Sequence, residues 1–134
     1  MDYYRAIMDD YLDETVKLVN YGKFHVLGHL TLPLPYIKNN VGLDLTFDDR
    51  TERLEEIFSL MIDKGIGLEL NTNRGSAPLP SARLLRLFRR MGGQIVTIGS
   101  DAHTSNRVGD HTFQACEILK DIFGYVCTFE DRKP

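Results

Sequence analysis

The sequence predicts an α/β fold with a parallel sheet, and two observations lead to this prediction. Stretches with apolar residues three or four positions apart alternate with short apolar runs along the chain. The first pattern is typical of amphipathic helices and the second of buried strands. Strands separated by single helices are joined by right-handed crossovers and lie parallel. A complete (β/α)8 barrel takes about 250 residues, so this chain of 134 residues should form either a small open sheet or part of a barrel.

The first helix and strand are expected near the amino terminus. Residues 3–20 have the helical spacing, and Gly22 is expected to end that helix. The apolar run FHVLGHL, residues 24–30, then indicates a strand. Pro33 and Pro35 follow, and two prolines so close together predict a loop rather than regular structure.

The middle of the chain predicts a second helix and a second strand. Residues 46–49 offer N-cap side chains, an apolar face follows, and the helix is expected to stop near Gly65. In the strand IGLELNT, residues 66–72, the leucines lie on one face and Glu69 and Asn71 on the other. We expect the polar face to line the mouth of a site, and a strand with one solvated face is the alternative.

The last part of the chain repeats the helix–strand pattern twice. Pro80 is expected to open a third helix that closes at Gly92. QIVTIGS, residues 94–100, indicates the third strand. A fourth helix through residues 113–123 and a final strand YVCTF, residues 125–129, complete the predicted order.

The composition excludes several classes of protein. A net charge of −3 provides no basic footprint for nucleic acid. No apolar run approaches the roughly 18 residues of a membrane span, and the amino end is acidic rather than similar to a signal peptide. We therefore expect a soluble, cytoplasmic protein with one domain, residues 1–134. Cys116 and Cys127 are expected to be buried free thiols.

Polar side chains follow two of the predicted strands. Asp101 emerges at the carboxyl end of the third strand, and His103 lies two residues later. His29 ends the first strand and is preceded by Gly28. Functional residues of α/β proteins gather at such strand ends, where an acid and imidazoles suit a divalent metal or a base with its orienting acid. Alternatively, Asp101 caps a turn and the histidines are ordinary polar residues.

Two arginines are expected in loops at the same edge of the sheet. Arg74 follows the second strand and its Asn71, and Arg107 follows the turn that holds His103. An arginine in this position suits a phosphate or carboxylate group, and a solvated loop arginine is the alternative. The chain has no G-x-S-x-G, G-x-x-x-x-G-K-[ST] or G-x-G-x-x-G motif, so serine hydrolase, P-loop and dinucleotide-binding functions have no support.

Several motifs together resemble one family. GHLTLP, LELNTNRG, GGQIVTIGSDAHTSNRVG and the closing FEDRKP are similar, in order and spacing, to the carboxyl-terminal half of the PHP-type histidinol-phosphatases. The resemblance covers nearly the whole chain and implies about half of a distorted (β/α)7 barrel. It also implies a phosphomonoester hydrolase that converts L-histidinol phosphate to L-histidinol in histidine biosynthesis, with zinc, manganese or iron as cofactor.

The resemblance also implies roles for individual residues. The expected metal ligands are His29, Asp101 and His103, of which Asp101 and His103 are also the expected catalytic residues. The expected substrate-binding residues are Arg74, which matches a phosphate-contacting position, together with Asn71 and Arg107. The implied partner is a phosphorylated small molecule.

The sequence departs from the family pattern in one large way. The family begins with a strand that bears H-x-H, and no H-x-H occurs among the four histidines of this chain. The full metal cluster is therefore not expected from this chain alone, and we expect a homo-oligomer or a complementing half-barrel. The alternative function is that of a catalytically inactive half-barrel that acts as an oligomerising or structural module.

Overall fold

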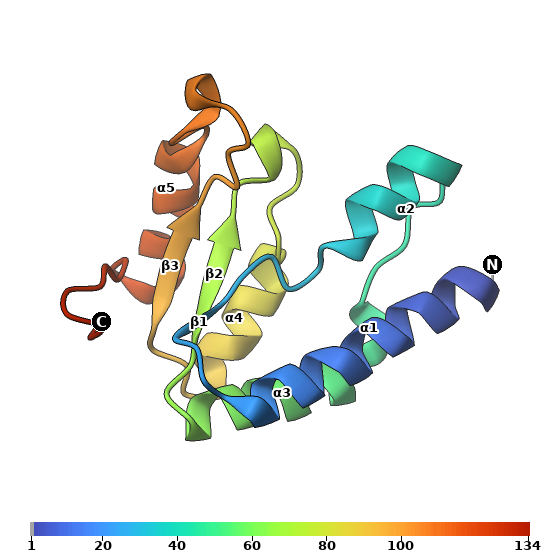
Figure 1. Cartoon of the computed structure of the whole chain (residues 1–134), viewed down its shortest axis with the longest axis horizontal. Coiled ribbons are helices and arrows are strands. Elements are labelled where there is room, and N and C mark those ends of the chain that lie inside the picture. Colours follow the sequence, from blue (N-terminus) through green and yellow to red (C-terminus); the bar gives the residue numbers. More distant parts are fainter. Residues whose placement is uncertain (1) are drawn as a thin grey trace.

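A computed structural model describes residues 2–134 and confirms the α/β fold with a parallel sheet. Three strands lie in the order β1-β2-β3, and both pairs are parallel (Figure 1). The strands are β1 (Val26–Leu27), β2 (Gly67–Asn71) and β3 (Val96–Gly99). The helices are α1 (Asp2–Tyr21), α2 (Pro33–Val41), α3 (Thr51–Asp63), α4 (Ala82–Arg90) and α5 (Thr112–Phe123). Three 3-10 turns are η1 (Asp48–Arg50), η2 (Asn73–Gly75) and η3 (Ser105–Arg107).

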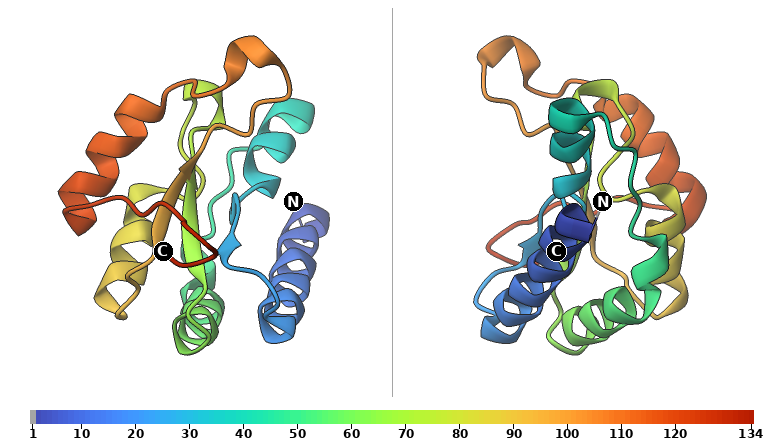
Figure 2. Two further views of the ribbon diagram at one scale, coloured as in Figure 1. Left: turned by 60° about the vertical axis from the view of Figure 1, so that its left-hand side comes forward. Right: turned by 90° about the vertical axis from the view of Figure 1, so that its right-hand side faces the viewer.

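The central strand β2 anchors the hydrophobic core. Leu68 and Leu70 are fully buried, as the predicted alternation requires, and helices α4 and α5 lie on one side of the sheet (Figure 2). Phe58 of α3 and Phe88 of α4 pack together with their ring centroids 5.2 Å apart. No helix within residues 2–134 is long and apolar enough to cross a membrane.

The prediction of a loop at the two prolines is wrong, because this segment forms helix α2. Pro33 and Pro35 both lie in the first helical turn. Backbone N–H groups in that turn have no acceptor within the helix, so the missing N–H of proline interrupts no hydrogen bond there. The helix ends at Gly42, whose positive φ of 71° allows its N–H to bond the carbonyl of Lys38.

Two predicted strands differ from the structure. The strand predicted over 24–30 is reduced to β1, because His29 turns the backbone with a φ of 32°. The strand predicted over 125–129 is wrong. This segment follows the edge of β3 but bonds it through the N–H of Cys127 and the carbonyl of Val96, 2.8 Å apart. Cys116 and Cys127 are both free, as predicted, but both are half-buried rather than buried.

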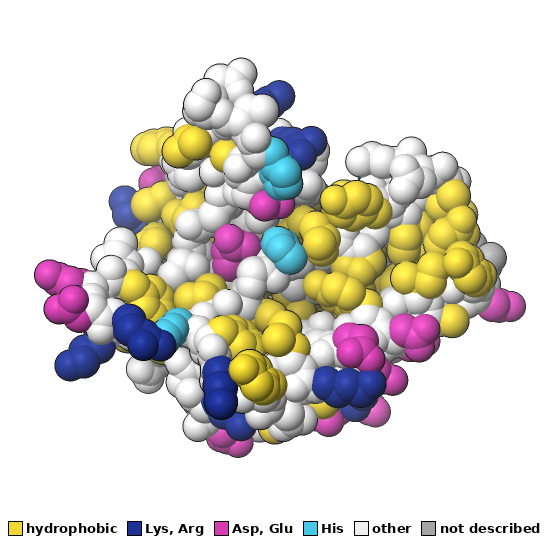
Figure 3. Space-filling view, in the orientation of Figure 1, with side chains coloured by type: hydrophobic (Ala, Val, Ile, Leu, Met, Phe, Trp, Pro, Cys, Tyr) yellow, Lys and Arg dark blue, Asp and Glu magenta, His cyan; other side chains and the backbone are white. Residues whose placement is uncertain are grey.

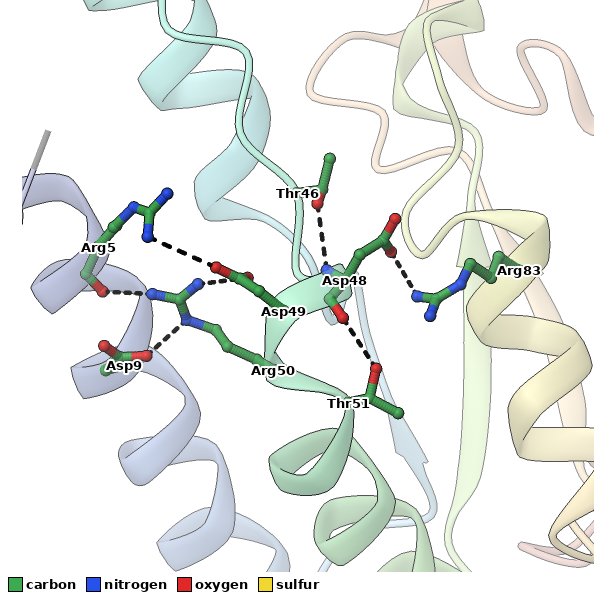
Figure 4. Close-up of polar contacts among 8 residues, drawn as sticks. All are labelled: Arg5, Asp9, Thr46, Asp48, Asp49, Arg50, Thr51 and Arg83. Carbon is green, nitrogen blue, oxygen red and sulfur yellow. Dashed lines mark hydrogen bonds and ion pairs between the residues drawn. The ribbon is translucent and has the colours of Figure 1, made fainter.

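Arg50 ties helix α1 to the turn that precedes α3 (Figure 4). Its side chain is 11% exposed, and Nε donates to Asp9 Oδ1 at 2.5 Å. Nη1 donates to Asp49 Oδ1 at 2.7 Å, and Nη2 to the backbone carbonyl of Arg5 at 3.1 Å. One guanidinium therefore satisfies acceptors from two segments that lie about forty positions apart in the sequence.

We expect Arg50→Ala to lower the free energy of unfolding by about 1–2 kcal/mol, because it removes several charge-assisted hydrogen bonds from a mostly buried side chain. Chemical denaturation followed by circular dichroism measures this change. Lys38→Ala is the matched control, since the Lys38–Asp44 pair is largely exposed and exposed pairs contribute little. Equal effects of the two substitutions would contradict the tethering role of Arg50.

Candidate functional site

The carboxyl ends of the parallel strands meet at one edge of the sheet, and the turns η2 and η3 lie beside it (Figure 1). A cavity of about 210 Å³ opens at this edge. Of the predicted site residues, Asn71, Arg74 and Asp101 line it. The wall is completed by residues of α2 and of the neighbouring loops, among them Tyr36 and Ser100. The edge of the sheet that was predicted to carry polar side chains therefore borders a cavity.

Glu69 of β2 holds the neighbouring strand ends together. Its Oε2 accepts a hydrogen bond from the backbone N–H of His29 at 2.8 Å, and Asn71 Nδ2 lies 3.4 Å from the same oxygen. Glycines make room for the carboxylate on both sides. A Cβ at Gly99 would lie 1.8 Å from Glu69 Oε1, and a Cβ at Gly28 would lie 3.3 Å from Oε2.

Sequence reasoning placed Glu69 on the polar face of its strand but did not include it among the site residues. The signal that could have found it is the pair of glycines, Gly28 and Gly99, at the ends of the two flanking strands. A glycine in a strand often marks a close approach of another group. Here the approaching group is the Glu69 carboxylate.

His29 adopts a backbone conformation that is unusual for a residue other than glycine, with a φ of 32°. Such conformations cost of order 1–2 kcal/mol, and a hydrogen bond from an N–H to a charged carboxylate is worth a similar amount, about 1.5–3 kcal/mol. The bond to Glu69 therefore offsets the backbone strain. The imidazole Nδ1 of His29 is buried and has no hydrogen-bond partner among the described residues.

Asp101 and His103 form a turn directly after β3. Asp101 is exposed and has a φ of 50°, and its backbone carbonyl lies 2.7 Å from His103 Nδ1. A carbonyl oxygen can only accept a hydrogen bond, so Nδ1 carries the proton. The lone pair of His103 Nε2 is then free, which is the tautomer that a metal ligand or a general base requires.

The two candidate arginines differ in their surroundings. Arg74 lies in η2 with a φ of 55° and lines the cavity. Arg107 does not line it, and its Nη1 donates to Asp110 Oδ2 at 2.8 Å. That hydrogen bond lowers the pKa of the Asp110 carboxyl below its ordinary value, with a further contribution from His111. The structure thus brings Arg74, and not Arg107, to the cavity.

Asn71 is 2% exposed and uses its side chain within the protein. Its Oδ1 accepts the backbone N–H of Asn73 at 2.8 Å, which shapes the turn that carries Arg74. This bond also fixes the orientation of the amide and directs Nδ2 toward Glu69. Asn71 therefore lines the cavity and also stabilises the turn that carries Arg74.

The structure does not gather the three predicted metal ligands into one cluster. No group of three or more His, Cys, Asp or Glu side chains within the described part of the chain is placed to hold a metal ion. Single donors nevertheless suit a metal, namely the unpartnered Nδ1 of His29, the free Nε2 of His103 and the exposed Asp101 carboxylate. The assignment of the three as ligands stays a prediction.

Known proteins are similar to this chain in sequence over most of its length. No family model matches the chain. A probable histidinol-phosphatase of Thermotoga maritima is 33% identical over 103 residues, which are 75% of this chain and 42% of that protein. The histidinol-phosphatase of Lactococcus lactis is 28% identical over 126 residues, which are 91% of this chain and 45% of that protein. The chain is a homologue of histidinol-phosphatases.

A solved structure supports the homology to histidinol-phosphatases. It is the crystal structure of the histidinol phosphate phosphatase from Lactococcus lactis, complexed with zinc, L-histidinol and phosphate. The TM-score is 0.77 at 26% identity, and the match covers 93% of this chain and 49% of the other. The fold is therefore that of a partial PHP-type barrel, as the sequence predicted. The chain spans less than half the length of the two histidinol-phosphatase sequences named above.

Proposed function

We propose that this chain contributes part of a metal-dependent phosphomonoester hydrolase of the histidinol-phosphatase type, which acts on L-histidinol phosphate. The observation that carries the proposal is the structural match, over nearly the whole chain, to a phosphatase that holds zinc, L-histidinol and phosphate. The cavity at the strand ends is the place where the phosphate group would bind.

Different residues at or near the cavity would bind the phosphate group and the metal in such a reaction. Arg74 would bind two phosphate oxygens with its guanidinium and offset their charge. His29, Asp101 and His103 would supply ligand atoms, and the tautomer of His103 is already the required one. Arg107 would reach the phosphate only after its bond to Asp110 is released. A bound divalent metal would polarise the phosphoryl group and lower the pKa of a bound water to about 7.

The remaining ligands would come from outside residues 2–134, either from another copy of this chain or from a segment that carries further strands. The absence of a three-residue ligand cluster within residues 2–134 motivates this part of the proposal. A broad apolar surface over α1 and α2 also favours association (Figure 3). Tyr3, Tyr36 and Val41 are exposed there, and an open groove of about 500 Å³ runs between the two helices.

The same observations favour a second candidate function, that of a catalytically inactive module that only associates. The two candidates differ in one measurable respect. A phosphatase subunit releases phosphate when its partner is present, and a structural module does not. Light scattering at micromolar concentration tests association of the chain separately from phosphate release.

The decisive experiment is a phosphate-release assay on L-histidinol phosphate with zinc or manganese. The purified chain is measured alone and after mixing with the part of the Lactococcus lactis histidinol-phosphatase that this chain does not match. We expect release from the mixture to exceed that from either piece by at least about tenfold, because the ligand set is completed only there. If folded pieces associate without releasing phosphate, the inactive module is the correct function.

A further inference from the structure

Glu69 is the acidic side chain with the most hydrogen bonds at the candidate site, and it is not among the predicted site residues. Its Oε2 receives the N–H of His29 from the end of β1 and lies within 3.4 Å of Asn71 Nδ2. Asn71 in turn accepts the N–H of Asn73, which precedes Arg74. One carboxylate oxygen therefore connects the turn that carries His29 with the turn that carries Arg74.

The surroundings of Glu69 indicate that it acts through other residues and does not bind a ligand itself. Its Oε2 is already engaged by two groups of the protein, the His29 N–H at 2.8 Å and Asn71 Nδ2 at 3.4 Å. Its Oε1 packs against Gly99, where a Cβ would overlap it. The carboxylate is therefore half-buried and lies between the ends of the two outer strands.

His29 is the residue that depends most on this carboxylate. Its backbone is in the left-handed region with a φ of 32°, and its amide bonds Glu69 Oε2 at 2.8 Å. A hydrogen bond to an ionised acceptor is roughly twice as strong as one to a neutral acceptor. The backbone angles of His29 determine where its unpartnered Nδ1 lies.

We propose that Glu69 is a positioning residue, whose carboxylate fixes the backbone of His29 and so presents the His29 imidazole to a bound cation. The proposal rests on the proposed function in one respect, namely that His29 binds a metal. Glu69 then acts on the metal only through His29. Its effect on metal binding disappears when the imidazole is absent.

A double-mutant cycle with zinc ions alone tests this dependence. Zinc affinity is measured by calorimetry in the mixture with the complementing part of the Lactococcus lactis histidinol-phosphatase, for the unaltered chain and for Glu69→Ala, His29→Ala and the double variant. We expect Glu69→Ala to weaken binding about tenfold in the presence of His29, as is typical when a group that orients a ligand is lost. In the His29→Ala background we expect no further loss. An equal loss in both backgrounds would overturn the proposal and make Glu69 a ligand itself.

Hydrogen exchange gives a second readout that needs no metal. We expect the His29 amide to exchange at least about tenfold faster in Glu69→Ala, because its acceptor is lost. Glu69→Gln keeps an oxygen acceptor of the same shape and should restore part of the protection. Glu55→Ala, on the exposed face of α3, is the control and should leave His29 unchanged. Unchanged His29 exchange in Glu69→Ala would overturn the proposal.

The two readouts separate this proposal from the proposed function. If the mixture binds no zinc but the His29 amide loses protection in Glu69→Ala, the metal assignment fails, and the role of Glu69 in fixing the His29 backbone stands. If zinc binds and neither readout responds to position 69, the positioning role fails and the metal assignment stands.

Discussion

Replacing Asp101 with asparagine is expected to lower phosphate release from L-histidinol phosphate by more than about 100-fold in the complemented assembly. The carboxylate lies directly after β3 and lines the cavity, where it would bind a cation. Loss of a group that merely orients a metal ligand typically costs about 10- to 100-fold in metal affinity or activity, and loss of a ligand should cost more. Asparagine removes the charge and keeps the shape of the side chain.

The choice of asparagine also keeps the backbone unchanged. Asp101 has a φ of 50°, and asparagine is the other side chain that tolerates this region well. Asp121→Asn is the matched control, because Asp121 pairs with Arg86 on the surface between α4 and α5. We expect the control to retain full activity. An active Asp101→Asn variant, in an assembly that depends on added metal, would remove Asp101 from the ligand set.

The second large effect is expected at Arg74. Arg74→Ala should lower kcat/KM for L-histidinol phosphate by about 100- to 1,000-fold, the range found when a donor to developing charge is removed. Arg74→Lys should lose less, because lysine keeps the charge but not the two-pronged contact with phosphate. Steady-state kinetics of the complemented assembly measures both variants.

Two other arginines are useful comparisons for Arg74. Arg86 is exposed and paired with Asp121 away from the cavity, so Arg86→Ala should not change kcat/KM. Arg107→Ala should have a smaller effect than Arg74→Ala, since Arg107 is held by Asp110 outside the cavity. A larger effect at Arg107 would show that η3 rearranges when the substrate binds.

The helices and the parallel order of the sheet could be predicted because apolar periodicity records them directly. Leu68 and Leu70 show the clearest case, since their alternation with Glu69 gave both the strand and its buried face. The prediction failed for the segment with two prolines, because the effect of a proline on a helix depends on its position in that helix. Pro33 and Pro35 read as helix breakers, yet in a first turn they remove no hydrogen bond.

The candidate site was predictable in location but not in detail. Strand ends gave Asp101 and Arg74, and both line the cavity. The role of Glu69 depends on contacts across three strands, and such contacts need the register of the sheet. Likewise, the engagement of Arg107 by Asp110 depends on the turn geometry of η3, which no local pattern specifies. The sequence therefore identifies the polar side chains at this edge of the sheet, and the fold determines which hydrogen bonds they form.

The close contact between Glu69 and Gly99 couples two positions that lie thirty residues apart in the sequence. A methyl group at position 99 would occupy the volume of the Glu69 carboxylate, so any side chain there would force the end of the Glu69 side chain to move. The displaced carboxylate would then lose its hydrogen bond from the His29 N–H, even where Glu69 itself is kept. Among homologues, an alanine or serine in place of Gly99 should accompany a shorter residue in place of Glu69. Position 99 would thus report, in any related sequence, whether the cross-strand acid is retained.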